Sequence, residues 1–197
     1  MPAHPPPSPD PLRSGAATVR AGAALEIRPV MAADLPGITA VQADILRRGV
    51  AVPGVTPMDL RQVTALRESL VVRGYPCLVA LRDGAVVGFA FAQPFGAREA
   101  WRATVEATVA VHPDAAGQGA GRALLASLVA ACEAKGFRQM IAVLDAGTAG
   151  EGMVALHRAL GFSHAGVLRG VGLVLGAPVD SLLLQRALGE AGTRSAA

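Results

Sequence analysis

A short stretch rich in glycine most constrains how this chain can fold. Gly117, Gly119 and Gly121 lie within five residues, and a helical pattern of apolar residues begins directly after them. Glycine inside a helix costs roughly 0.5–1 kcal/mol relative to alanine, so three glycines at a helix start indicate that something approaches the main chain closely. Successive backbone N–H groups at a helix start, helped by the helix dipole, favour a bound anion such as phosphate. The segment is therefore predicted to be a strand, a phosphate-binding loop and a helix.

The loop matches neither of two common nucleotide-binding patterns. A P-loop places Lys and then Ser or Thr after its last glycine, whereas Arg122 and Ala123 follow Gly121 here. A dinucleotide fingerprint needs a third glycine three residues after the second, and the two possible registers place Arg122 or Leu124 there. A tight turn without a ligand is the alternative, although one glycine would suffice for that.

The remaining elements alternate between helices and strands. Apolar residues at helical or alternating spacing, with glycines after the helices, predict the order β-α-α-β-β-β-α-β-α-β-β. Asp34 is expected to cap the first helix, and Asp83-Gly84 to form the two-residue turn of a hairpin. This order predicts an α/β fold with a mixed sheet. The predicted strands are 25–30, 77–93 (the hairpin), 103–111, 138–144, 165–175 and 179–188, and the predicted helices begin near 35, 60, 122 and 151.

Composition excludes several classes of protein. Of the 197 residues, 52% are hydrophobic and 17% are charged, which favours a globular body, and no apolar run approaches the ~20 residues of a membrane-spanning helix. The net charge of +3 is too small to indicate nucleic-acid binding. Cys77 and Cys132 lie among apolar neighbours, which favours two buried free thiols in a reducing cytoplasm.

The two ends of the chain differ in composition from the part between them. Residues 1–24 are rich in Pro, Ala and Gly without helical or strand periodicity, and they are predicted to be a disordered tail that is no secretory signal. Residues 189–197 are expected to form a second loose end. The folded domain is therefore predicted to span residues 25–188.

The segment "VHPDAAGQGAGRALL" resembles the pyrophosphate loop of the GNAT superfamily of acyl-CoA-dependent N-acyltransferases. That loop reads Gln/Arg-x-x-Gly-x-Gly/Ala after a strand ending in Val-x-Pro, and Val111, Pro113, Gly119 and Gly121 stand in register. Ala116 replaces the Gln or Arg of the first position. A narrower resemblance, over about residues 26–188, is to the phosphinothricin acetyltransferase type, whose motifs occur here in the same order. The resemblance implies a mixed, splayed sheet and acetyl-CoA as co-substrate, and no ligand cluster in the sequence indicates a metal.

The resemblance also implies where acetyl-CoA binds. The glycine loop would hold the pyrophosphate, and the end of the preceding strand would contact the pantetheine arm and the thioester carbonyl. The cofactor-binding residues predicted in this way are Val109, Ala110, Val111, Gly117, Gln118, Gly119, Ala120, Gly121 and Arg122.

Glu106 is the predicted general base. Strand alternation places Glu106 and Thr108 on one face, and a carboxylate in so apolar a strand is costly unless it has a task or a partner. The match "TVEATV" implies the family's glutamate base, and an exposed, solvated carboxylate at a sheet edge is the alternative. His157, in "ALHRALGF", matches a histidine that would protonate the departing thiolate, and its alternative is a residue at the edge of the core.

Arg98 and Trp101 are predicted to contact the acceptor. Arg98 matches a family arginine in the amine-substrate loop and could bind a substrate carboxylate as a bidentate fork, or else lie solvated in its loop. Trp101 stands where the family usually has tyrosine.

The predicted function is acetyl transfer from acetyl-CoA to the primary amine of a small amino-acid-like substrate. Two alternatives stay open: a protein N-terminal acetyltransferase, and a catalytically degenerate acyl-CoA-binding module. The second is motivated by Ala116 and by Gly150 and Met153, which replace the Asn and Ser of the family's Asn-x-x-Ser. The resemblance further suggests a homodimer.

Overall fold

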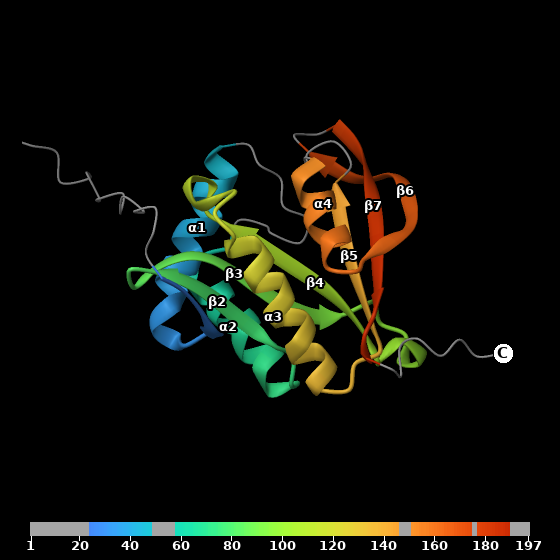
Figure 1. Ribbon diagram of the computed structural model, residues 1–197, viewed down its shortest axis with the longest axis horizontal. Coiled ribbons are helices and arrows are strands. Elements are labelled where there is room, and N and C mark those ends of the chain that lie inside the picture. Colours follow the sequence, from blue (N-terminus) through green and yellow to red (C-terminus); the bar gives the residue numbers. More distant parts are fainter. Residues whose placement is uncertain (1–23, 49–57, 146–150, 175–176, 190–197) are drawn as a thin grey trace, which may run out of the picture.

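The computed structural model describes residues 24–48, 58–145, 151–174 and 177–189, which form one seven-stranded sheet with helices on both faces (Figure 1). The strands lie in the order β1-β2-β3-β4-β5-β7-β6, and only β4 and β5 are parallel neighbours. The predicted mixed α/β sheet is therefore confirmed. The strands are β1 (Leu25–Pro29), β2 (Cys77–Arg82), β3 (Ala85–Pro94), β4 (Thr104–Val111), β5 (Gln139–Asp145), β6 (Ser163–Val174) and β7 (Ala177–Ala187).

The helices follow the predicted order as well. They are α1 (Leu35–Arg47), α2 (Leu60–Val72), α3 (Ala120–Ala134) and α4 (Glu151–Ala159), with three short 3-10 helices η1 (Ala32–Asp34), η2 (Glu99–Trp101) and η3 (Pro113–Ala115). The predicted hairpin turns at Asp83 and Gly84, whose φ angles are +51° and +76°, as a type I′ turn requires. The predicted disordered tail and the Pro/Gly-rich loop after α1 lie outside the described residues.

Two apolar clusters fill the space between the sheet and its helices. One lies under α3 and contains Leu124, Leu128 and Cys132 together with Val105 and Val109 of β4. The other lies under α1 and α2 and contains Ile38, Leu70 and Phe89. Side chains of β4 alternate between them, since Ala107 belongs to the first and Ala110 to the second. Glu106 and Thr108 consequently share the face that α1 and α2 cover.

Strands β4 and β5 separate part-way along their length. They are paired only from Thr104 to Ala107, where Ala107 lies opposite Ala142. Beyond this point β4 stays paired with β3 as far as Val111, while β5 stays paired with β7 as far as Asp145. The two strands visibly diverge in Figure 1. The residues of β4 after Ala107 thus lack a neighbouring strand on their β5 side within the described part of the chain, which is the splayed sheet that the resemblance implied.

The two cysteines are free thiols on opposite faces of the sheet. Cys132 belongs to the cluster under α3, whereas half-buried Cys77 packs against the cluster under α1 and α2. Burial raises the pKa of Cys77 to about 11 and that of Cys132 to about 12, so both thiols are protonated near neutral pH. None of the helices in the described ranges is long and apolar enough to cross a membrane.

Asp34 precedes α1, as predicted, but it does not cap the helix with its side chain. Its carboxylate instead accepts hydrogen bonds from both terminal nitrogens of Arg28, at 2.7 and 2.8 Å, and from the backbone N–H of Met31. A charge-assisted bidentate ion pair is stronger than a single capping hydrogen bond, which explains why the Asp34 carboxylate binds Arg28 and does not cap α1. Asp59, by contrast, caps α2 by accepting from the N–H of Gln62 at 2.8 Å.

We expect Asp34→Asn to lower the free energy of unfolding by about 1–3 kcal/mol at pH 7, because a buried, charge-assisted pair is lost. The Arg28 guanidinium holds the pKa of Asp34 below its ordinary 3.8, so the charged carboxylate stabilises the fold above that pH. The difference between wild type and variant should shrink as pH falls through the lowered folded-state pKa. Urea unfolding between pH 7 and pH 2 measures it.

Asp59→Asn is the matched control, since asparagine caps helices as well as aspartate does. Its unfolding free energy should stay within about 0.5 kcal/mol of the wild type. Equal losses in the two variants would contradict the distinct roles of these aspartates.

Candidate active site

The glycine loop joins the end of β4 to the start of α3, and two of its three glycines are explained by their backbone conformation. Gly117 and Gly119 adopt φ angles of +71° and +87°, a region that residues with a Cβ rarely occupy. Gly121 has no such angle, and a Cβ there would make ordinary contacts, at 3.4 and 3.5 Å, with Leu156 in α4 and Val111 in β4. Two of the three glycines are therefore required by backbone conformation, and the close approach of a ligand to the loop stays a prediction.

Loop residue Gln118 is held from two sides. Its side-chain oxygen and its backbone carbonyl, the latter at 3.1 Å, accept from the guanidinium of Arg82. Its amide nitrogen donates to the carbonyl of Asp114 at 2.8 Å. The Asp114 carboxylate in turn binds both terminal nitrogens of Arg48, at 2.8 and 3.0 Å. The loop is therefore fixed to both β2 and the C-terminal end of α1.

Glu106 lies half-buried in the paired part of β4, just before the strands separate. Burial raises the pKa of its carboxyl above the ordinary value, and a side-chain hydrogen bond with Gln93, its cross-strand neighbour, partly offsets this. Thr108 follows on the same face, 3% exposed, and its hydroxyl has no hydrogen-bond partner among the described residues. A carboxylate with a raised pKa beside an unpartnered hydroxyl is typical of a site that handles protons.

His157 of α4 is 2% exposed and packs edge-on against Phe162, with ring centroids 5.1 Å apart. Its Nδ1 lies 2.9 Å from the carbonyl of Met153, and burial lowers the pKa of the ring. A carbonyl only accepts, so Nδ1 carries the proton and Nε2 of the neutral ring has a lone pair. In this state Nε2 is an acceptor, whereas the resemblance implies a proton donor.

Arg98 and Trp101 lie in the connection between β3 and β4, at the opposite end of β4 from the glycine loop. The Arg98 guanidinium lies over the Trp101 ring, 4.9 Å from its centroid, and that ring stacks on Phe95 at 5.5 Å. Both residues are exposed, and such stacking leaves the edge of a guanidinium free to bind a carboxylate. Along β4, the structure therefore places Arg98 and Trp101 first, Glu106 next and the glycine loop last.

The sequence did not predict a functional role for three buried polar residues. Thr108 and Gln42 are almost fully buried with an unpartnered oxygen each, and Arg82 contacts Gln118 from a distant strand. Gln42 could have been found, because it interrupts the apolar face of the predicted first helix. Arg82 could not, since only the fold brings residue 82 to residue 118.

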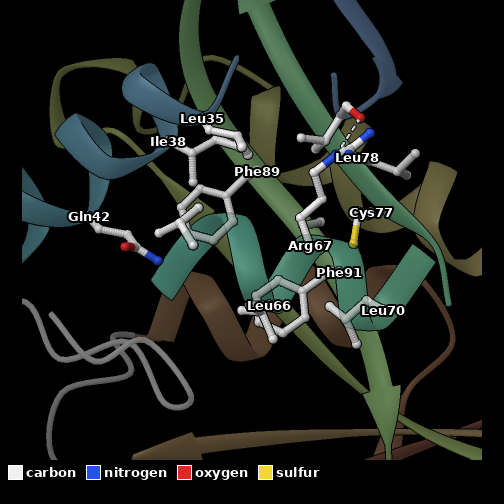
Figure 2. Close-up of a pocket in the computed structure, with 13 residues that line it drawn as sticks. Leu35, Ile38, Gln42, Leu66, Arg67, Leu70, Cys77, Leu78, Phe89 and Phe91 are labelled. Atoms are coloured by element: carbon white, nitrogen blue, oxygen red, sulfur yellow. Dashed lines mark hydrogen bonds between the residues drawn. The ribbon is translucent and has the colours of Figure 1, made fainter. Parts of the chain in front are cut away.

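Gln42 borders a small cavity between α1, α2 and the sheet. Figure 2 shows the rings of Phe89 and Phe91 on its wall, with Arg67 donating to the carbonyl of Val30 at 3.1 Å. The volume of about 30 Å³ suits roughly one water molecule. The cavity is too small to hold an acceptor substrate.

The loop and the diverging strands together suit acetyl-CoA. Gly119 is left-handed and Ala120 begins α3, a pair of conformations that can direct successive backbone N–H groups toward one anion. The edge of β4 that β5 leaves unpaired offers backbone groups to an extended chain. No three His, Cys, Asp or Glu side chains gather as metal ligands in the ranges that the structure describes.

Comparison with known proteins decides the family. The Acetyltransferase (GNAT) family description matches residues 54–162. The chain belongs to this family. It is 42% identical to the phosphinothricin N-acetyltransferase of Alcaligenes faecalis, over 95% of this chain and 94% of that one.

Two solved structures share this fold over most of the chain. The Sinorhizobium meliloti phosphinothricin acetyltransferase in complex with AcCoA is 40% identical, with a TM-score of 0.79 over 88% of this chain and 93% of its own. A protein described as a ribosomal-protein-alanine N-acetyltransferase from Brucella melitensis is 36% identical, with a TM-score of 0.78 over 83% and 99% of the two chains. The chain is therefore an acetyl-CoA-dependent acetyltransferase.

We expect Gly119→Ala to weaken acetyl-CoA binding about tenfold or more, because a Cβ at φ +87° shifts the loop amides. Gly136→Ala is the matched control, since Gly136 has φ +79° and equally open surroundings at the other end of α3. Both variants should lose ~1–2 kcal/mol of stability through the same strain. Titration calorimetry with acetyl-CoA separates them, and unchanged binding by Gly119→Ala would place the cofactor elsewhere.

Proposed function

We propose that this GNAT enzyme transfers the acetyl group of acetyl-CoA to the primary amine of a small amino-acid-like acceptor. The observation that carries the proposal is Glu106, a carboxylate with a raised pKa that lies where β4 leaves β5. The names of the Alcaligenes and Sinorhizobium relatives support phosphinothricin or a related amino acid as acceptor.

The reaction needs a free amine, because an ammonium has no lone pair. Glu106 takes the ammonium proton, directly or through a water that the Thr108 hydroxyl helps to hold. The amine nitrogen then bonds to the thioester carbon, the C–S bond breaks, and CoA leaves as the thiolate. The nitrogen loses its second proton to give the amide, and the thiolate takes up a proton to become the thiol. Burial suits Glu106 to this task, because a carboxylate with a raised pKa accepts a proton more readily at neutral pH.

Backbone groups near Val109 and Val111 would bind the thioester carbonyl and the pantetheine arm. Since β5 no longer pairs with this part of β4, these groups are available without breaking a strand contact. Donors held by a rigid strand stabilise the tetrahedral oxyanion without reorganisation.

His157 is the second proposed catalytic residue, and its proposed role is to protonate the departing thiolate. It can donate to the thiolate only as the imidazolium, because the neutral ring keeps its proton on Nδ1. Burial lowers the pKa of His157 and opposes this form, so positioning of the pantetheine arm is the competing role.

Arg98 is the proposed partner of the acceptor carboxylate, with Trp101 as its platform. A guanidinium stacked on an aromatic ring is held in one plane, which suits bidentate binding of a carboxylate. Because Arg98 precedes β4 and the glycine loop follows it, acceptor and cofactor would reach Glu106 from opposite ends of the strand.

The enzyme is further proposed to be a cytoplasmic homodimer. Two free thiols support a reducing compartment. The edge strand β6 exposes four apolar side chains, which supports pairing with a second copy: Val167, Leu168, Val171 and Leu173. Sedimentation equilibrium tests this state, and a monomer at micromolar concentration would exclude it.

An acceptor panel tests the function. Purified protein should release CoA thiol with phosphinothricin or methionine sulfone, and about tenfold or more slowly with analogues whose α-carboxylate is amidated, since these lose a charge-assisted bond. Arg98→Met should remove this preference by raising KM only for the carboxylate form. Faster turnover with N-terminal peptides would favour a protein N-terminal acetyltransferase, and tight acetyl-CoA binding without turnover would contradict an active enzyme.

Glu106→Gln keeps the size of the side chain but cannot accept the ammonium proton. Turnover at pH 7 should fall about 10²–10⁴-fold, and the loss should shrink toward the pKa of the amine, where solution supplies the free base. In the wild type, kcat/KM should fall as the pH drops through the raised pKa of Glu106 and protonates the base. The variant should lack this acidic limb.

Glu99→Gln, at an exposed glutamate of η2, serves as the control and should keep wild-type turnover. His157→Asn retains a donor for the Met153 carbonyl but cannot titrate, so the same assay reports on the second proposed residue. A fall in kcat would support proton donation by His157, and unchanged kcat would leave it a packing role. Near-wild-type turnover of Glu106→Gln would contradict the mechanism.

A further inference from the structure

A buried arginine outside the glycine motif contacts the loop that the motif forms. Arg82 ends β2 and is 6% exposed. One terminal nitrogen of its guanidinium donates to the side-chain oxygen of Gln118, and the other donates to the backbone carbonyl of Gln118 at 3.1 Å. Its Nε is buried without a hydrogen-bond partner among the described residues.

This guanidinium has no counter-ion in the part of the chain that the structure describes. None of the ion pairs there includes Arg82, and the carboxylate of Asp114, which belongs to the same network, is already bound by Arg48. A buried charge without an opposite charge is costly, so its position calls for a compensating anion. The carbonyl and amide oxygens of Gln118 supply only partial charges.

The loop itself supplies little positive charge. Ala116, Gly117, Gly119, Ala120 and Gly121 carry no polar side chain. The next cation along the chain, Arg122, is exposed at the start of α3. Apart from the helix dipole, the buried charge next to the loop is therefore that of Arg82.

We propose that Arg82 is the positioning residue of the cofactor loop and the counter-charge for the pyrophosphate of acetyl-CoA. Because the Gln118 carbonyl is bound to Arg82, it cannot turn toward the bound anion, and the loop amides keep the conformation set by Gly117 and Gly119. Arg82 thereby supplies the polar side chain that the loop lacks where Ala116 replaces the Gln or Arg of the motif. This inference rests on the proposed function.

The test compares two acetyl donors. S-Acetylpantetheine carries the same thioester as acetyl-CoA but no pyrophosphate or nucleotide. In Arg82→Met, KM for acetyl-CoA should rise about 10- to 100-fold with kcat nearly unchanged, while kcat/KM for S-acetylpantetheine stays at the wild-type value. Arg82→Lys keeps the charge but not the two-pronged contact, so its KM should lie between those of wild type and Arg82→Met. Arg73→Met, at an exposed arginine stacked on Tyr75, should change neither donor.

Unchanged KM for acetyl-CoA in Arg82→Met, or equal losses with both donors, would overturn the inference, because the residue would then be dispensable or merely support the fold. If Arg82→Met does not fold, Arg82→Lys carries the test: a rise in KM for acetyl-CoA alone supports the inference, and equal changes with both donors overturn it. Calorimetry with acetyl-CoA distinguishes failure of the proposed function from failure of the role of Arg82. If the wild type does not bind acetyl-CoA, the proposed function itself is contradicted. If the wild type and Arg82→Met bind acetyl-CoA equally well, only the role of Arg82 is contradicted.

Discussion

The separation of β4 from β5 is the constraint on which the rest of the site depends. Within a sheet, each backbone N–H and C=O is satisfied by a neighbouring strand, and a strand that loses its neighbour must find other partners. Here β4 leaves β5 after Ala107 and continues as far as Val111 with β3 alone. β5 is held apart by its pairing with β7, which extends to Asp145. The edge exposed by this divergence can bind an extended acyl carrier without disturbing the core.

The two faces of β4 have different roles: one packs into the core and the other carries the polar residues. Strand alternation separates them. Val105, Ala107 and Val109 pack under α3 and make β4 rigid, while Glu106 and Thr108 face α1 and α2. Because β4 is packed rigidly against α3 on one face, the half-buried carboxylate of Glu106 on the other face keeps its position. Its raised pKa follows from burial, which disfavours the charged form and which the hydrogen bond with Gln93 only partly offsets.

The sequence predicted the order of the elements and the position of the glycine loop between strand and helix well, because both depend on local signals. Asp83-Gly84 fixes its hairpin by the φ angles of two residues, and Gly117 and Gly119 mark the loop in the same way. Asp34 shows where local signals fail: Arg28, which is close only after the chain folds, takes the carboxylate that would have capped α1. Arg82 was missed for the same reason, since its contact with Gln118 spans 36 positions. The tautomer of His157, by contrast, is set within its own helix, since Nδ1 donates to the carbonyl of Met153 four residues earlier.

The contacts of the glycine loop explain how so flexible a sequence can form a prepared binding site. Glycine loses more backbone entropy on folding than any other residue, so a loop with three glycines would pay that cost on binding unless the fold had already ordered it. Arg82 from β2 holds the loop at Gln118, and Arg48 from α1 holds it at Asp114. His112, which bonds Asp44 at 2.8 Å and accepts from the N–H of Asp114, ties the end of β4 to α1 as well. The loop is thus already ordered by folding, and under the proposed function the binding energy of the pyrophosphate would help to hold the thioester beside Glu106.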